Sequence, residues 1–166
     1  MNFIPSDNQV GHATPCAAIV DEVGEGILPG WCKRENLVYA FELSEPTPSN
    51  NVIKNMHWQT YKRLRQEWRL RVFVEGLNAR HVQATLEKSA LVVVRRCSGS
   101  LDWDNAYGGL KPVLDCLVKR TPRNPDGLGL ILDDNPSSMP YPPLLVQRPA
   151  KRGAGSTLVL VFKLDN

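Results

Sequence analysis

The chain lacks the features that mark several common protein classes. Among its 166 residues, no apolar run approaches the length of a membrane-spanning helix, and no basic segment near the N-terminus leads into an apolar core. A P-loop, a dinucleotide-binding glycine pattern and internal repeats are also missing. We therefore expect a cytoplasmic protein that does not associate with membranes and uses no small-molecule cofactor.

Cysteine is scarce, and the four cysteines lie far apart, at positions 16, 32, 97 and 116. No Cys-x-x-Cys pair is present, which argues against a zinc knuckle. The lack of an export signal argues against a disulfide framework. The thiols are therefore expected to be reduced.

Basic residues are unevenly distributed along the chain. Residues 1–47 carry two basic and seven acidic side chains, whereas residues 48–166 carry eighteen basic and ten acidic ones. The formal net charge of +3 hides this difference. A strongly basic main body suits a polyanion, and nucleic acid is the commonest one.

Hydrophobic periodicity predicts one α/β domain of the α+β type, with a mixed sheet packed against two main helices. Residues 1–36 contain Pro5, Pro15 and Pro29 and predict an N-terminal arm, and residues 37–166 predict the folded domain. Strands are expected at 37–43, 90–95, 128–133, 144–148 and 157–164, and helices over 57–77, 78–88 and 110–120. The order is roughly β-α-β-α-β-β-β, and the last two strands are expected to be antiparallel neighbours.

The helix over 57–77 combines an apolar stripe with an excess of positive charge. The stripe follows steps of three and four and consists of Trp58, Tyr61, Leu64, Trp68 and Val72. Both tryptophans are expected in the core. The remaining surface is basic with few acidic partners, which favours an anionic ligand over an ordinary solvated face. From charge, the residues expected to contact DNA phosphates are Lys62, Arg63, Arg65, Arg69, Lys151 and Arg152.

Five aspartates and one lysine stand in three short stretches, 101–105, 110–115 and 130–134. Asp102 and Asp104 would point to the same side of an extended segment. Asp133 and Asp134 end a predicted strand, where α/β proteins tend to place ligands. Like charges this close repel one another, and a divalent cation that prefers hard oxygen ligands, Mg²⁺ or Mn²⁺, removes the conflict.

Lys111 and Asp115 are four residues apart on the predicted helix over 110–120, so they share a face. Pro112 fits the first turn, where its missing N–H costs nothing. Lys119 and Arg120 suit the C-terminus, where cations interact favourably with the helix dipole. The lysine and the aspartate can therefore pair with each other or both approach a metal site.

These motifs resemble the RusA family of Holliday junction resolvases. The family pattern runs Asp-x-Asp-Asn, then a lysine, an aspartate four residues beyond it, and an Asp-Asp pair at the end of a following strand. The matching residues are Asp102, Asp104 and Asn105, then Lys111 and Asp115, then Asp133 and Asp134. A Pro-Ser-Asn-Asn segment at 48–51, followed by a basic helix, is also shared, and the resemblance covers about residues 37–164.

The spacing before the lysine departs from the family. Lys111 follows Asp104 by seven residues, where the type sequence has four, and the extra residues include Gly108 and Gly109. Three added residues are close to one helical turn of about 3.6 residues, so a helical insertion would keep the facing of Lys111. The two glycines favour a loop or bulge instead.

The resemblance implies a homodimeric, Mg²⁺-dependent endonuclease that cleaves four-way DNA junctions, with Mn²⁺ able to substitute. It implies that Asp102, Asp104 and Asp134 are metal ligands and that Lys111 is their basic catalytic partner. The resemblance also implies that Asn105, Asp115 and Asp133 lie beside these residues and support them.

Other interpretations of the same residues stay open. The aspartates could instead be helix caps and salt-bridge partners. That interpretation explains the presence of Asp115 and, in part, of Asn105, but it does not explain two separate carboxylate clusters. The protein could be a metal nuclease of similar fold with another DNA or RNA substrate. It could also be a non-catalytic module that binds nucleic acid.

Overall fold

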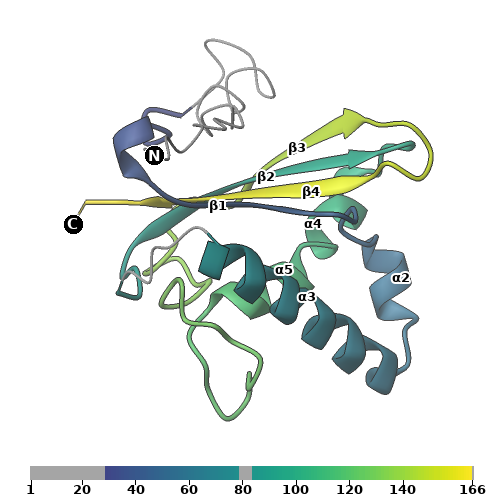
Figure 1. The fold of residues 1–166 in the computed structure, drawn as a ribbon, viewed down its shortest axis with the longest axis horizontal. Helices are drawn as coiled ribbons and strands as arrows, with labels where there is room; N and C mark the ends of the chain where they lie inside the picture. Colours follow the sequence, from purple (N-terminus) through teal and green to yellow (C-terminus); the bar gives the residue numbers. More distant parts are fainter. Residues whose placement is uncertain (1–28, 79–83, 166) are drawn as a thin grey trace, which may run out of the picture.

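The computed structural model describes residues 29–78 and 84–165, with the side chains of 75–78 left out. Within these residues, one mixed sheet has the strand order β1-β4-β2-β3 (Figure 1). The strands are β1 (Leu37–Leu43), β2 (Ser89–Cys97), β3 (Leu144–Pro149) and β4 (Ser156–Lys163). β4 pairs antiparallel with both β1 and β2, and β3 pairs parallel with β2.

The two central strands are buried on both faces. Successive side chains of a strand point to opposite faces, so each strand contributes to two apolar layers. On one face the core includes Leu91, Val93, Val159 and Val161. On the other it includes Val92, Val94, Leu158, Leu160 and Phe162. The unbroken apolar runs of β2 and β4 are explained by this double burial.

Helices cover one face of the sheet, as Figure 1 shows. The long helix α3 (Trp58–Asn78) contacts β1 and the shorter α5 (Lys111–Leu117), and its Trp68 and Val72 are buried in the core. Three short elements complete the described fold: η1 (Arg34–Asn36), α2 (Asn50–Lys54) and α4 (Trp103–Gly108). The prediction of a single α+β domain, with a mixed sheet against two main helices, is confirmed.

The opposite face of the sheet is covered by the segment that leads into β1. The Trp31 ring packs edge-on against Phe162 at 5.6 Å between ring centroids, and it stacks on Tyr141 at 5.8 Å. Residues 29–36 therefore pack against the domain. The rest of the predicted N-terminal arm, residues 1–28, lies outside the described residues.

The predicted strand over 128–133 is wrong. The segment forms only isolated bridges, in which Ile131 pairs with Leu86 and with Val118. Gly129 has a φ of 79°, which an extended strand does not allow. The backbone N–H groups of Leu128 and Leu130 instead donate to carbonyl oxygens at the end of α5. Apolar character here reflects burial under α5 and not membership of the sheet.

The two C-terminal strands are not neighbours, contrary to the prediction, because β2 lies between them. β2 is the strand with both faces and nearly its whole length buried, so it takes a central position with a partner on each edge. The described residues contain one strand fewer than the predicted order. Within 84–88 there is no helix, and the rest of the predicted helix over 78–88 falls mainly on residues outside the described part.

Two further expectations about the helices are corrected. Trp58 is 64% exposed and is the first residue of α3, so it does not belong to the core. α5 ends at Leu117, so Lys119 and Arg120 follow the helix and do not belong to its last turn. None of the helices in the described residues is long and apolar enough to cross a membrane.

Replacing Trp68 with alanine should strongly destabilise the protein. Its side chain is only 1% exposed, and removal leaves a cavity between α3 and the sheet, so we expect the free energy of unfolding to fall by about 3–5 kcal/mol. Leu70→Ala is the matched control, since Leu70 lies on the same helix but is 61% exposed; its effect should stay within about 0.5 kcal/mol. Urea unfolding followed by circular dichroism measures both. Equal losses would mean that α3 does not pack through Trp68.

Candidate functional site

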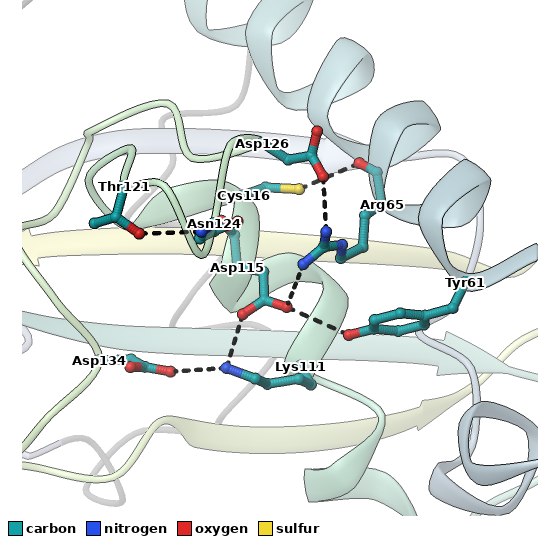
Figure 2. Close-up of polar contacts among 9 residues, drawn as sticks. All are labelled: Tyr61, Arg65, Lys111, Asp115, Cys116, Thr121, Asn124, Asp126 and Asp134. Atoms are coloured by element: carbon teal, nitrogen blue, oxygen red, sulfur yellow. Dashed lines mark hydrogen bonds and ion pairs between the residues drawn. The ribbon is translucent and has the colours of Figure 1, made fainter. Parts of the chain in front are cut away.

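Lys111 forms ion pairs with two aspartates from separate parts of the chain. It is the first residue of α5, and Asp115 lies one turn later on the same helix. The Lys111 Nζ is 2.7 Å from Oδ1 of Asp115 and 3.5 Å from Oδ2 of Asp134 (Figure 2). The fold thus brings the middle and the end of the sequence motif together.

The charge of Lys111 is stabilised by these neighbours. Partial burial lowers the pKa of its ammonium group, but the hydrogen bonds and charges of Asp115 and Asp134 outweigh burial and raise the pKa above its usual value. Lys111 is therefore positively charged at neutral pH. In that state it can offset negative charge that develops on a phosphate, but it has no free electron pair to accept a proton.

The second oxygen of Asp115 points toward α3. Its Oδ2 accepts a hydrogen bond from the Tyr61 hydroxyl at 3.3 Å and lies 3.5 Å from a terminal nitrogen of Arg65. The other terminal nitrogen of Arg65 is 3.0 Å from Oδ2 of Asp126 (Figure 2). One arginine on α3 therefore holds both α5 and the loop that contains Asp126.

Tyr61 remains a neutral hydrogen-bond donor in this network. Burial, together with the negative charge of Asp115, raises the pKa of its hydroxyl to about 12. The guanidinium of Arg65 also lies over the Tyr61 ring, 5.4 Å from its centroid, in a cation–π contact. These contacts hold the carboxylate of Asp115 in one orientation beneath Lys111.

An open cleft of about 450 Å³ lies beside Lys111 and is lined by Asp115, Asp133 and Asp134 among others. The Asp134 side chain is 32% exposed, so its carboxylate is accessible from this cleft. Asp133 is engaged by its own neighbours, because its Oδ1 accepts from the backbone N–H of Asp134 and its Oδ2 accepts from Asn135 Nδ2. Asp133 thus shapes the turn that presents Asp134.

Asp102 and Asp104 are not in an extended segment, so the expected arrangement on one side of a strand is wrong. Asp102 is the N-cap of α4, and its Oδ1 accepts from the backbone N–H of Asn105 at 2.9 Å. This bond, with a second one from Asn105 Nδ2, lowers the pKa of the Asp102 carboxyl below its usual value. Asp104 is exposed in the first helical turn.

The Pro-Ser-Asn-Asn segment packs against α4. Asn105 accepts a hydrogen bond at its Oδ1 from the backbone N–H of Asn51, 3.1 Å away. A Cβ atom at Gly109 would collide with the carbonyl oxygen of Pro48, and one at Gly108 would collide with the side chain of Asn50. The backbone of α4 approaches this segment so closely that only glycine fits at its C-terminal end.

The longer spacing before Lys111 is accommodated by a helix followed by a short connection. α4 contains the residues up to Gly108, and Gly109 caps it with a φ of −68°, an ordinary helical value. The glycines are needed for close approach and not for an unusual backbone conformation. The sequence left two alternatives open, a helical insertion and a loop or bulge. The structure shows that the insertion is mainly helical.

The predicted metal ligands fall in two places. Asp134 lies in the cleft beside Lys111, whereas Asp102 and Asp104 lie on α4 and do not line that cleft. In the described part of the chain, no group of three or more histidine, cysteine, aspartate or glutamate side chains is arranged to hold a metal ion. The accessible carboxylates of these aspartates are nevertheless the kind of ligand that suits Mg²⁺, which prefers oxygen.

The basic residues predicted to contact DNA also divide into two groups. Lys62, Arg63, Lys151 and Arg152 are exposed. The side chain of Arg65 is only 18% exposed and forms ion pairs with Asp115 and Asp126. Its charge therefore stabilises the site from within. Arg69 is half-buried.

Sequence reasoning misses Asp126 and the part played by Tyr61. Asp126 is a single acidic residue in a loop, outside any motif, and the sequence pattern assigns Tyr61 only to the apolar stripe of the helix. Asn124, which donates from Nδ2 to the backbone carbonyl of Asp115 at 2.6 Å, is missed as well. No local pattern marks these residues, because each acts on a partner many residues away.

The fold and the site define a small α+β protein whose basic body carries a cleft with a lysine between carboxylates. No protein-family model matches the chain, and no curated protein is significantly similar to it.

Replacing Gly109 with alanine should disturb the contact between α4 and Pro48. The added methyl group would meet a backbone carbonyl that cannot move aside alone, so we expect a loss of about 1–3 kcal/mol in the free energy of unfolding. Gly99→Ala is the control, since a Cβ there meets no atom within 4 Å. Chemical denaturation compares the two variants. A Gly109 variant as stable as the control would show that α4 can shift freely.

Proposed function

We propose that this protein is a Mg²⁺-dependent, structure-selective DNA endonuclease that cuts branched DNA such as four-way junctions. The observation that carries the proposal is the approach of Lys111 to Asp134, 3.5 Å apart, in an open cleft. A cation beside an accessible carboxylate is the arrangement that phosphodiester hydrolysis needs, because the carboxylate can bind a metal and the cation can stabilise charge on the phosphate.

The residues have distinct roles in this proposal. Asp102, Asp104 and Asp134 are the residues that would hold Mg²⁺, or Mn²⁺ in its place, and of these only Asp134 lines the cleft, while Asp102 and Asp104 lie at α4. When bound, the metal would supply Lewis acidity at the scissile phosphate. Lys111 neutralises charge on the phosphate, and Asp115, held by Arg65, keeps the lysine in place.

Exposed basic residues on α3 and in the loop between β3 and β4 would hold the phosphate backbone without reading its sequence. Symmetric cuts in a junction need two active sites, so the proposal includes a homodimer with two-fold symmetry. Such an enzyme would act in the cytoplasm in DNA recombination or DNA repair.

Cleavage of a labelled synthetic four-way junction tests the proposal directly. Linear duplex and single strands are run beside it, each with Mg²⁺, Mn²⁺ or EDTA. We expect paired nicks near the branch point that disappear in EDTA. Asp104→Asn should reduce the rate at least about a hundredfold, the scale of losing one preorganised charged group, while junction affinity is kept or rises because phosphate repulsion falls.

Asp165→Asn is the matched control, since it also removes one exposed carboxylate but belongs neither to α4 nor to the lining of the cleft. It should cleave like the unchanged protein. Junctions that bind but stay intact with either metal would point to a non-catalytic binding module. Equal cleavage of linear duplex or of RNA would point to a nuclease with a different substrate.

Junction affinity should fall steeply with salt, because each phosphate contact releases counterions. The double variant Lys62→Gln/Arg63→Gln should lower the slope of log affinity against log salt by about 2. Lys33→Gln, which removes an exposed charge outside α3, should leave the slope unchanged. Fluorescence anisotropy between about 50 and 300 mM salt measures these slopes. A flat series for the unchanged protein would contradict electrostatic binding of DNA.

A further inference from the structure

Two exposed aromatic side chains on α4 have no part in the proposed chemistry. Trp103 is 62% exposed and Tyr107 is 41% exposed. They are four residues apart on the helix and therefore share one side of it. Their ring centroids are 6.1 Å apart, with an angle of 39° between the ring planes. Large rings that meet each other in solvent, instead of in the core, offer a surface to a ligand.

The helix that carries the rings is fixed in place. Ala106, which lies between the two rings in the sequence, is fully buried, and Asn105 is tied to α2 through the backbone of Asn51. Gly109 leaves no space between α4 and the segment at Pro48. Turning the rings inward would break these contacts, so the exposure of the two rings is a consequence of the fold.

The rings adjoin the carboxylate of the proposed metal site. Asp104 lies three residues before Tyr107, which makes these two residues neighbours on the helix surface. A flat group stacked on these rings would therefore lie beside Asp104. The adjacent phosphate of a nucleotide would then lie where the proposed function needs it.

The basic charge of residues 48–166, with eighteen basic and ten acidic side chains, favours a nucleic acid over a protein partner. The backbone of Leu101, just before α4, exchanges two hydrogen bonds of 2.8 Å with the side chain of Gln147 on β3. β3 then leads into a loop with two exposed cations, Lys151 and Arg152. Exposed aromatic rings on a protein surface that also carries exposed cations are the combination that binds unpaired nucleotides, through stacking and phosphate contacts together.

We propose that Trp103 and Tyr107 form a stacking site for an unpaired nucleobase, which positions the neighbouring phosphate at Asp104. Bases inside a duplex are already stacked on their neighbours, whereas bases at a branch point or in a single strand are free to stack on protein. The site thus selects DNA with unpaired or loosely stacked bases. This inference rests on the proposed function, because that function makes Asp104 a ligand of the metal that acts on the scissile phosphate.

The test compares a double variant without flat rings with one that keeps them. Trp103→Leu/Tyr107→Leu keeps an apolar surface but removes the rings, and Trp103→Phe/Tyr107→Phe keeps two rings. Each is titrated in EDTA against a single strand and against a four-way junction with 2-aminopurine at the branch point. We expect the unchanged protein to quench the 2-aminopurine fluorescence. The leucine variant should lose this quenching and bind at least about tenfold more weakly, and the phenylalanine variant should restore most of both.

The outcomes separate this inference from the proposed function. If the unchanged protein quenches the probe but cuts no DNA with Mg²⁺ or Mn²⁺, the stacking site stands and the endonuclease proposal fails. If it cuts junctions and the leucine variant quenches, binds and cuts equally well, the stacking site is overturned and the endonuclease stands.

Two other results would also overturn the stacking site. One is a leucine variant that changes only the oligomeric state in sedimentation, which would assign the rings to contact between protein chains. The other is an unchanged protein that binds neither DNA, which would overturn both proposals. Leu70→Ala, which removes an exposed apolar side chain from α3, is the control for a general loss of apolar surface.

Discussion

The candidate site depends on the pairing of one buried carboxylate. Asp115 is 8% exposed, and a charge in such a place is stable only with partners that compensate its lost hydration. Lys111 pairs with one of its oxygens, and Tyr61 and Arg65 contact the other. These partners come from two helices, so the same interaction that neutralises the charge also fixes how α3 and α5 lie together. Arg65 extends the connection to the loop at Asp126.

A second constraint is the close approach of α4 to the segment at Pro48. Here the packing is between backbones, and glycine is required because any side chain at Gly109 would occupy the position of the carbonyl. The result is a rigid short helix that presents Asp102 and Asp104 on one end and two aromatic rings to solvent. Binding and chemistry would both gain from such rigidity, since a preorganised site loses little entropy when its ligand arrives.

The two proposals use different physical properties of one surface. Lys111 and the carboxylates act through charge on the phosphate, while Trp103 and Tyr107 act through stacking on the base. Together they would recognise a nucleotide that is both charged and unpaired. The exposed cations on α3 and after β3 add affinity for any DNA but cannot distinguish a branch from a duplex.

The α+β class, the strands at 37–43 and 90–95, the long basic helix and the shared face of Lys111 and Asp115 could all be predicted from the sequence, because each follows from a local period of two, three or four residues. The tertiary structure was needed to place β2 between β3 and β4, to bury Ile131 in a segment that forms no strand, and to bring Arg65 to Asp126. It also placed Trp58 in solvent and made Asp102 a helix cap. These features depend on partners far along the chain, and a local pattern states that a residue is apolar or charged but not which distant residue it meets.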